Sequence, residues 1–231
     1  MPKLVGQNVE GVEYTIDGTT VVAGIGAEIF NIDSNNNKAS GKYSHAEGYY
    51  TVASGDWSHA ENYYTVASGE YSHAEGAGTK AFDNGSHAEG MATIASGSAA
   101  HAEGAATQAT NGSAHAEGSE TIASGTTSHA EGKGTIADSE YQHAQGKWNI
   151  EDSDGIYSHI VGNGESDTKR SNAHTLDWQG NAWFAGDVYV GSTSGTNKDE
   201  GSVKLQKSIT GTAGQVVGFD ANGNAVAQNN P

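Results

Sequence analysis

The chain has 231 residues, with 28 acids against 11 bases, a formal net charge of -17 and no cysteine. The acidity argues against binding to nucleic acid or to an anionic membrane surface, because both interactions depend on Lys and Arg. The lack of cysteine excludes disulfides and cysteine-ligated metals, and the 33 glycines argue against long helices and a large aliphatic core. The chain begins without an apolar signal segment and has no run of about 18 apolar residues, so we expect neither an export signal nor a membrane span.

Residues 1–36 are expected to form β structure that attaches the chain to other proteins. Apolar and polar residues alternate over 12–16, Asp17-Gly18 is a hairpin signal, and residues 19–23 are expected to form the returning strand.

A 14-residue repeat dominates residues 37–162. Its histidines are His45, His59, His73, His87, His101, His115, His129 and His143, and His159 and His174 follow after spacings of 16 and 15. Each of the first seven is followed by Ala and then by a glutamate; these are Glu47, Glu61, Glu75, Glu89, Glu103, Glu117 and Glu131, with Gln145 in the eighth unit. Seven equal periods predict a repeat architecture.

A second signature, Thr-x-Ala, recurs half a period further on, from Thr51 to Ala137, and a faint earlier unit starts at Asn37. Both signatures are too short for helices, and their i, i+2 identities are typical of strands of three to five residues. Two strands and two turns per 14 residues predict one coil of a narrow parallel β-solenoid, with coils about 4.8 Å apart.

Strand alternation predicts which side chains face inward. In His-Ala-Glu the Ala points to one face while His and Glu point to the other, and in Thr-x-Ala the Thr and Ala share a face. An interior of methyl groups gains about 0.8 kcal/mol per buried methylene against an ordering cost above roughly 1 kcal/mol per residue. We therefore expect one chain to be marginal alone, and the His/Glu face or the Val/Ile positions to pack against other chains. Those positions are Val52, Val66, Ile94, Ile122 and Ile136.

The repeat decays after Gly146, where Trp148, Asn149 and Glu151 are expected to fill the second strand. The aromatic-rich residues 163–191 are expected to form a β cap, because the open strand edges of a last coil need cover. Residues 192–231 are expected to form a polar linker and a final hairpin around Asn222-Gly223.

Ser-His-Ala-Glu-Gly followed by Thr-x-Ala-Ser-Gly resembles the 14-residue head repeat of trimeric autotransporter adhesins. This YadA-like repeat also occurs in bacteriophage tail and fibre proteins, and the segment in residues 171–191 is similar to one near the C-terminal ends of such proteins. The resemblance covers residues 37–162. It implies an all-β, left-handed parallel β-roll that forms a homotrimer, with small β domains at both ends. The family has Val and Ile at positions that face the trimer axis, so the resemblance places the His/Glu ladder on that axis.

Three interpretations of the ladder compete. Three imidazoles could ligate a transition metal, or His and Glu could act as general acid and base. The ladder could instead be structural, because stacked carboxylates in a poorly solvated axis need partners and the imidazoles match them in number. We favour the structural interpretation, with His–Glu hydrogen bonds mostly between chains, and expect no catalytic residue, metal or other cofactor.

The aromatic residues Tyr49, Tyr50, Trp57, Tyr63 and Tyr64 recur in neighbouring coils, and the solenoid interior has no room for them. They are expected on an outer corner or in a groove between subunits. There they could stack on sugar rings of a host glycan, or pack between neighbouring subunits.

Together these features predict a bacteriophage virion protein: a homotrimeric fibre or decoration protein on the tail or capsid surface, extracellular when released. Residues 1–36 would contact other virion proteins, and the rod would contribute to host attachment. The alternative, a bacterial trimeric surface adhesin, needs an export signal and a C-terminal membrane anchor, and neither pattern is found. A depolymerase or self-cleaving spike is a third possibility, but we find no carboxylate pair outside the ladder to serve it.

Overall fold

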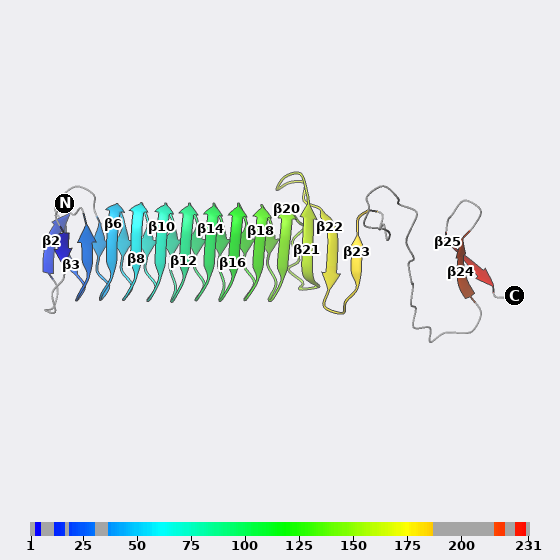
Figure 1. Cartoon of the computed structure of the whole chain (residues 1–231), viewed down its shortest axis with the longest axis horizontal. Coiled ribbons are helices and arrows are strands. Elements are labelled where there is room, and N and C mark those ends of the chain that lie inside the picture. Colours follow the sequence, from blue (N-terminus) through cyan, green and yellow to red (C-terminus); the bar gives the residue numbers. More distant parts are fainter. Residues whose placement is uncertain are drawn as a thin grey trace, which may run out of the picture. The chain divides into compact units, whose positions relative to one another are not determined.

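The computed structural model describes residues 3–5, 12–16, 19–30, 37–186, 215–219 and 225–229. The chain divides into two compact units, residues 1–187 and 188–231. All regular structure in these described segments is β, which confirms the predicted all-β class (Figure 1). Within the same segments no helix is long and apolar enough to cross a membrane.

The repeat forms a parallel solenoid with two strands in each coil. The His-Ala-Glu segments are five-residue strands: β6 His45–Tyr49, β8 His59–Tyr63, β10 His73–Ala77, β12 His87–Met91, β14 His101–Ala105, β16 His115–Ser119, β18 His129–Lys133 and β20 His143–Lys147. The Thr-x-Ala segments contribute two-residue strands: β5 Lys38–Ala39, β7 Val52–Ala53, β9 Val66–Ala67, β11 Lys80–Ala81, β13 Ile94–Ala95, β15 Gln108–Ala109, β17 Ile122–Ala123 and β19 Ile136–Ala137. The predicted 14-residue coil is confirmed, although the second strand is shorter than expected.

Equal coil lengths keep equivalent residues in register. In the pairing of β10 with β12, for example, His73 faces His87 and Glu75 faces Glu89. The five-residue strands lie in a 13-stranded sheet and the two-residue strands in an 8-stranded sheet. The two residues inserted before His159 do not disturb this register, because β20 pairs with β21 (Tyr157–Asn163) so that His143 faces His159. A long row of identical side chains follows directly from this arrangement.

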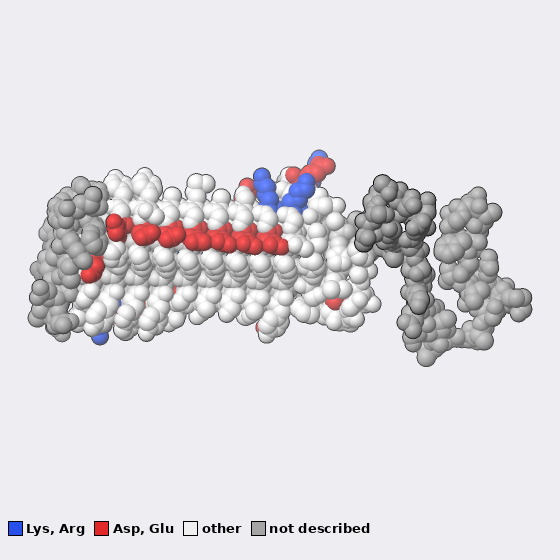
Figure 2. Space-filling model, in the orientation of Figure 1, with Lys and Arg blue, Asp and Glu red and all other residues white. Residues whose placement is uncertain are grey.

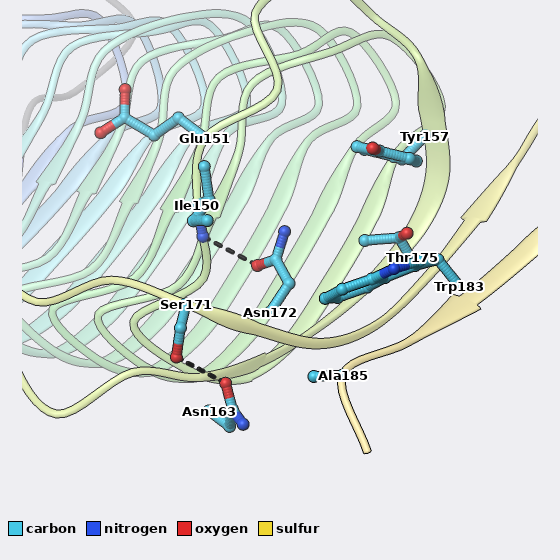
Figure 3. Close-up of a pocket in the computed structure, with 9 residues that line it drawn as sticks. All are labelled: Ile150, Glu151, Tyr157, Asn163, Ser171, Asn172, Thr175, Trp183 and Ala185. Atoms are coloured by element: carbon cyan, nitrogen blue, oxygen red, sulfur yellow. Dashed lines mark hydrogen bonds between the residues drawn. The ribbon is translucent and has the colours of Figure 1, made fainter. Parts of the chain in front are cut away.

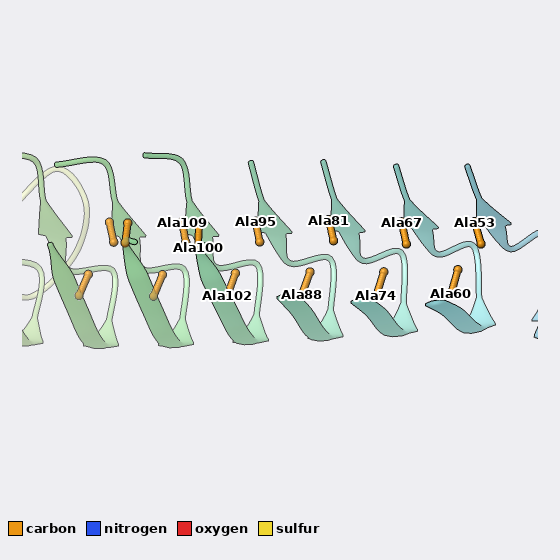
Figure 4. Packing of buried hydrophobic residues seen from close by; sticks show 14 of the residues in the cluster. Ala53, Ala60, Ala67, Ala74, Ala81, Ala88, Ala95, Ala100, Ala102 and Ala109 are labelled. Carbon is orange, nitrogen blue, oxygen red and sulfur yellow. The ribbon is translucent and has the colours of Figure 1, made fainter. Parts of the chain in front are cut away.

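The interior consists of alanine methyl groups, one from each strand, that face each other across every coil (Figure 4). These alanines and the repeated threonines are fully buried, whereas the His, Glu and most Val/Ile positions are only partly buried. The predicted inward and outward faces are therefore confirmed. At the two ends the alanine position is taken by Ile29 and Ile160, both fully buried, so larger side chains close the narrow interior.

Asparagines occupy the threonine position at both ends of the repeat. Oδ1 of Asn37 accepts a hydrogen bond from the N–H of Thr51 at 3.0 Å. Oδ1 of Asn149 accepts from the N–H of Ile136, and its Nδ2 donates to the carbonyl of the same residue, both at 2.8 Å. The expected second strand at 148–151 is wrong, because the Asn149 amide replaces the backbone partner that such a strand would supply.

Antiparallel strands follow the last coil. β21 pairs with β22 (Asn172–Asp177), which pairs with β23 (Ala182–Phe184). These strands cover the sheet edge, but Trp183 stays 56% exposed and Phe184 48%, so the described part of the expected aromatic cap, residues 163–186, does not bury these two rings.

At the N-terminal end, β1 (Lys3–Val5) pairs antiparallel with β4 (Glu28–Phe30), and β4 pairs in parallel with β6. The expected hairpin is confirmed as β2 (Val12–Ile16) against β3 (Thr19–Ala23). In the second unit, β24 (Gln215–Phe219) pairs with β25 (Ala225–Asn229), as expected. The expected linker and both hairpin turns lie outside the described residues.

Candidate functional site

All ten histidines form one column along the 13-stranded sheet. Consecutive ring centroids are 4.6–4.8 Å apart from His45 to His143, and the rings from His59 to His143 are parallel within 11°. The column continues through His159 at 5.2 Å and His174 at a further 5.7 Å. Sequence reasoning left these last two residues out of the ladder. The spacings of 16 and 15 were the available signal: two inserted residues precede His159 in a parallel strand, whereas His174 lies on the antiparallel strand β22.

The glutamates form a second row beside the histidines. Figure 2 shows this row as an unbroken red line along the coils, with Lys and Arg side chains gathered near one end. We use the term stripe for the eight histidines from His45 to His143 together with Glu47, Glu61, Glu75, Glu89, Glu103, Glu117, Glu131 and Gln145. Most stripe side chains are about one third exposed. Glu28, which the sequence analysis missed, occupies the histidine position in the preceding strand, and its carboxylate lies 3.8 Å from Nδ1 of His45.

The pairing between the two rows changes partway along the stripe. From His45 to His87 the nearest carboxylate belongs to the same strand, at 3.4–3.8 Å from Nε2. From His101 to His143 it belongs to the preceding coil, at 3.4–3.9 Å. Glu89 therefore lies between two imidazoles. All of these N···O distances exceed that of a normal hydrogen bond, so the predicted His–Glu hydrogen bonds are not made within one chain.

The imidazole Nε2 atoms are buried without being satisfied. Seven of them have no hydrogen-bond partner in the described part of the chain; they belong to His59, His73, His87, His101, His115, His129 and His143. A buried polar atom without a partner costs about 1–3 kcal/mol, and native proteins contain few of them. A run of seven equivalent atoms of this kind is therefore an unusual feature of the stripe.

Burial and mutual repulsion make four imidazoles of the column harder to protonate. Burial lowers the pKa of His59, His87, His115 and His159, and the charges of neighbouring imidazoles lower it further. A stack of rings at coil spacing cannot carry a positive charge on every ring without strong repulsion.

The carboxyl groups of three successive coils interact with each other. Hydrogen bonds with Glu89 and Glu117 favour the protonated form of Glu103 and raise its pKa to about 7. The same hydrogen bonds stabilise the ionised forms of Glu89 and Glu117 and lower the pKa of each. One carboxylic acid between two carboxylates thus reduces the negative charge of the central stripe.

Three groups of stripe side chains bring potential metal ligands together. The ligand atoms lie within 4.8 Å of one another in each of the sets Glu89–His101–Glu103, Glu103–His115–Glu117 and His129–Glu131–His143. All three sets fall in the half of the stripe where the imidazoles pair with the preceding coil.

The tyrosine pairs of two neighbouring coils stack on one corner of the solenoid. Tyr49 stacks on Tyr63 with centroids 5.5 Å apart and planes within 8°, and Tyr50 stacks on Tyr64 at 4.8 Å and within 3°. The predicted coil-to-coil stacking is confirmed. In this arrangement each ring covers a face of its neighbour, so a sugar could stack only on the faces at the ends of the ladder.

Trp57 belongs to a different ladder. It lies between Tyr43 and Tyr71, with centroid distances of 5.9 and 5.1 Å. All three residues have φ near +57° and occupy the left-handed position of the turn before the His strand, where they stay 44–57% exposed. The sequence analysis grouped Trp57 with the tyrosine pairs and missed Tyr43 and Tyr71, which the same 14-residue spacing would have identified.

A pocket of about 570 Å³ lies where the repeat gives way to the antiparallel strands (Figure 3). Tyr157, Thr175 and Trp183 line one side, and the N–H of Ile150 donates to Oδ1 of Asn172 at 2.8 Å within it. The remaining lining residues are Glu151, Asn163, Ser171 and Ala185. Glu151 is the one carboxylate among them, so the pocket does not offer the pair of acids typical of glycoside hydrolysis.

Comparison of the chain with protein-family models gave no match, and comparison with curated proteins gave none either. The functional interpretation therefore rests on the repeat and on the geometry of the stripe.

Proposed function

We propose that the chain is a non-enzymatic structural protein of a bacteriophage virion, a homotrimeric fibre or decoration protein of the tail or capsid that contributes to host-surface attachment. The observation that carries this proposal is the stripe, in which the seven imidazole Nε2 atoms from His59 to His143 are buried without a hydrogen-bond partner beside a row of carboxylates. These nitrogens lack hydrogen-bond partners in a single chain, so association would lower the cost of burying them once the side chains turn toward a neighbouring chain.

Association of chains through the stripe follows from two physical arguments. The interior holds little beyond methyl groups and threonine side chains, so one chain gains little hydrophobic stabilisation per coil. Parallel register also places equivalent residues at every coil, so a second copy aligned with the first meets complementary side chains along its whole length. The shift of the carboxylates between the two halves of the stripe would fix the axial position of each chain.

The assignment to a virion rests on the resemblance of the repeat to that of phage tail and fibre proteins, together with the similar aromatic segment. In this proposal the N-terminal β segment contacts other virion proteins. Host glycan is the proposed ligand of the exposed aromatic ladders. Glycan-array binding should fall when the five predicted aromatic residues are replaced by Ala; binding that survives this change would remove the glycan from the proposal.

The trimer is tested by light scattering on the purified chain, which should give three times the mass of 23.7 kDa. The double variant His87→Val, His101→Val removes two unpaired nitrogens, so the trimer should remain intact or become more stable. A monomeric chain, or loss of the trimer in this variant, would contradict the proposed role of the stripe. Antibody labelling of intact particles in electron micrographs tests the virion assignment, and absence of label from every particle would overturn it.

A further inference from the structure

The shift in pairing along the stripe creates ligand sets that its first half does not have. Where Glu61 pairs with His59 of its own strand, the carboxylate faces one imidazole. Where Glu131 pairs with His143 of the next coil, the carboxylate lies between two imidazoles, because His129 precedes it on its own strand. Identical sequence motifs therefore present different local chemistry in the two halves.

The group His129–Glu131–His143 has the donor atoms that a divalent transition metal prefers. Two imidazole nitrogens and one carboxylate form a known zinc ligand set, and all three ligand atoms lie within 4.8 Å of one another. Both Nε2 atoms are buried and have no hydrogen-bond partner among the described residues. Neutral imidazoles and one carboxylate would leave a bound dication with a net charge of about +1, which the neighbouring Glu117 would offset.

One distance within the set matches metal coordination better than it matches a hydrogen bond. Zinc–nitrogen and zinc–oxygen bonds of about 2.0–2.1 Å at a tetrahedral angle place the two ligand atoms about 3.3–3.5 Å apart. Nε2 of His143 and Oε1 of Glu131 are 3.4 Å apart. The two rings are parallel at 4.8 Å, so one imidazole must turn about its side-chain torsions for both nitrogens to point at one ion.

The last coil of the stripe also removes a competing ligand. Gln145 replaces the repeated glutamate, and its Nε2 donates to Nε2 of His159 at 3.1 Å. Glu131 is thus the final carboxylate of the row and has no acidic neighbour in the following coil. The other two ligand sets share Glu103, so they cannot both be filled by separate ions without sharing that carboxylate.

We propose that His129, Glu131 and His143 bind a divalent transition-metal ion of the Zn²⁺ or Co²⁺ class within a single chain. The proposal does not depend on the trimer, because one chain supplies all three ligands. In an assembled fibre the ion would satisfy two of the unpaired nitrogens near the C-terminal end of the stripe.

The test uses the full chain after treatment with a chelator, titrated with Co²⁺ by visible absorption and with Zn²⁺ by calorimetry. The wild type should take up metal saturably. The variant Glu131→Gln should lose the tightest class of site, with affinity at least about tenfold weaker. The matched control Glu61→Gln removes the same charge from a coil without a three-ligand set and should leave that class unchanged.

Several outcomes would overturn the proposal. One is that the wild type takes up no metal saturably below about 1 mM. Another is that Glu131→Gln and Glu61→Gln weaken metal binding equally, which would indicate attraction of the ion to an acidic surface alone. His143→Ala gives a second variant in case Glu131→Gln does not fold, and circular dichroism reports folding in each case. Light scattering on the same samples reads the oligomeric state separately, so the metal site and the trimer can fail independently.

Discussion

Replacing Glu103 by Gln should stabilise the protein in alkaline solution but much less in acid. The hydrogen bonds from neighbouring carboxyl groups raise the pKa of Glu103 from 4.5 to about 7 in the folded protein. A raised folded-state pKa contributes stability that is present below pH 4.5 and is lost as the pH rises through about 7. Gln resembles the protonated carboxyl at every pH, so the variant avoids this loss.

The magnitude follows from the size of the pKa change. A rise of about 2.5 pH units corresponds to about 3.4 kcal/mol at 1.36 kcal/mol per unit. The Glu103 side chain is 34% exposed, and solvent screening reduces the expected gain to about 1–2 kcal/mol at pH 8. At pH 5 the gain should shrink to about a quarter of this value, because Glu103 is then protonated in the folded wild type as well.

Urea denaturation of chelator-treated protein, followed by circular dichroism at pH 5 and pH 8, measures both differences. The comparison includes the effect on His115, because its Nε2 lies 3.7 Å from Oε1 of Glu103. Glu120→Gln is the matched control, since Glu120 is exposed on a corner outside the stripe. A gain equal at both pH values, or an equal gain in the control, would refute the argument that neighbouring carboxyl groups cause the effect.

Three further predictions concern the solenoid itself. Gly104→Ala should destabilise the protein by about 3 kcal/mol or more, because φ is +103° and an added Cβ would lie 2.2 Å from the carbonyl oxygen of Gly118. The control Gly112→Ala, whose Cβ would meet nothing closer than 3.9 Å, should be nearly neutral. Equal losses of stability in urea denaturation of the two variants would contradict this account. Asn149→Ala should cost about 1–3 kcal/mol by removing the amide that pairs with Ile136, so an unchanged midpoint would show that the end needs no such partner. Burial lowers the pKa of four column imidazoles, so their contribution to stability is present above pH 6.5 and lost as the pH falls, and a Tm that stays flat from acidic to neutral pH would rule this out.

The solenoid could be predicted from the sequence because every coil repeats the same local choice. Ala directly after each His and Ala two residues after each Thr leave only one arrangement in which both are inside. The inference failed where the repeat ends. Asn149 satisfies backbone groups with a side-chain amide, and a pattern of strand residues does not distinguish such a cap from another strand.

The sequence predicted which residues form the stripe but not which of their side chains interact. Spacing alone placed His and Glu on one outer face, and the tertiary structure confirms it. It could not tell whether Glu131 lies beside His129 or His143, because both are neighbours in a stacked sheet and the choice depends on side-chain torsions.

By itself, then, the sequence determined the all-β class, the 14-residue coil, the methyl-sized interior and the single face that carries the imidazoles and carboxylates. These follow from period and alternation, which are local properties of the backbone. Only the tertiary structure decided that the carboxylates shift from one imidazole to the next along the stripe, that Glu103 holds its proton between two others, and that asparagines close both ends. Each of these depends on distances between side chains of neighbouring coils, and a repeated sequence motif does not specify those distances.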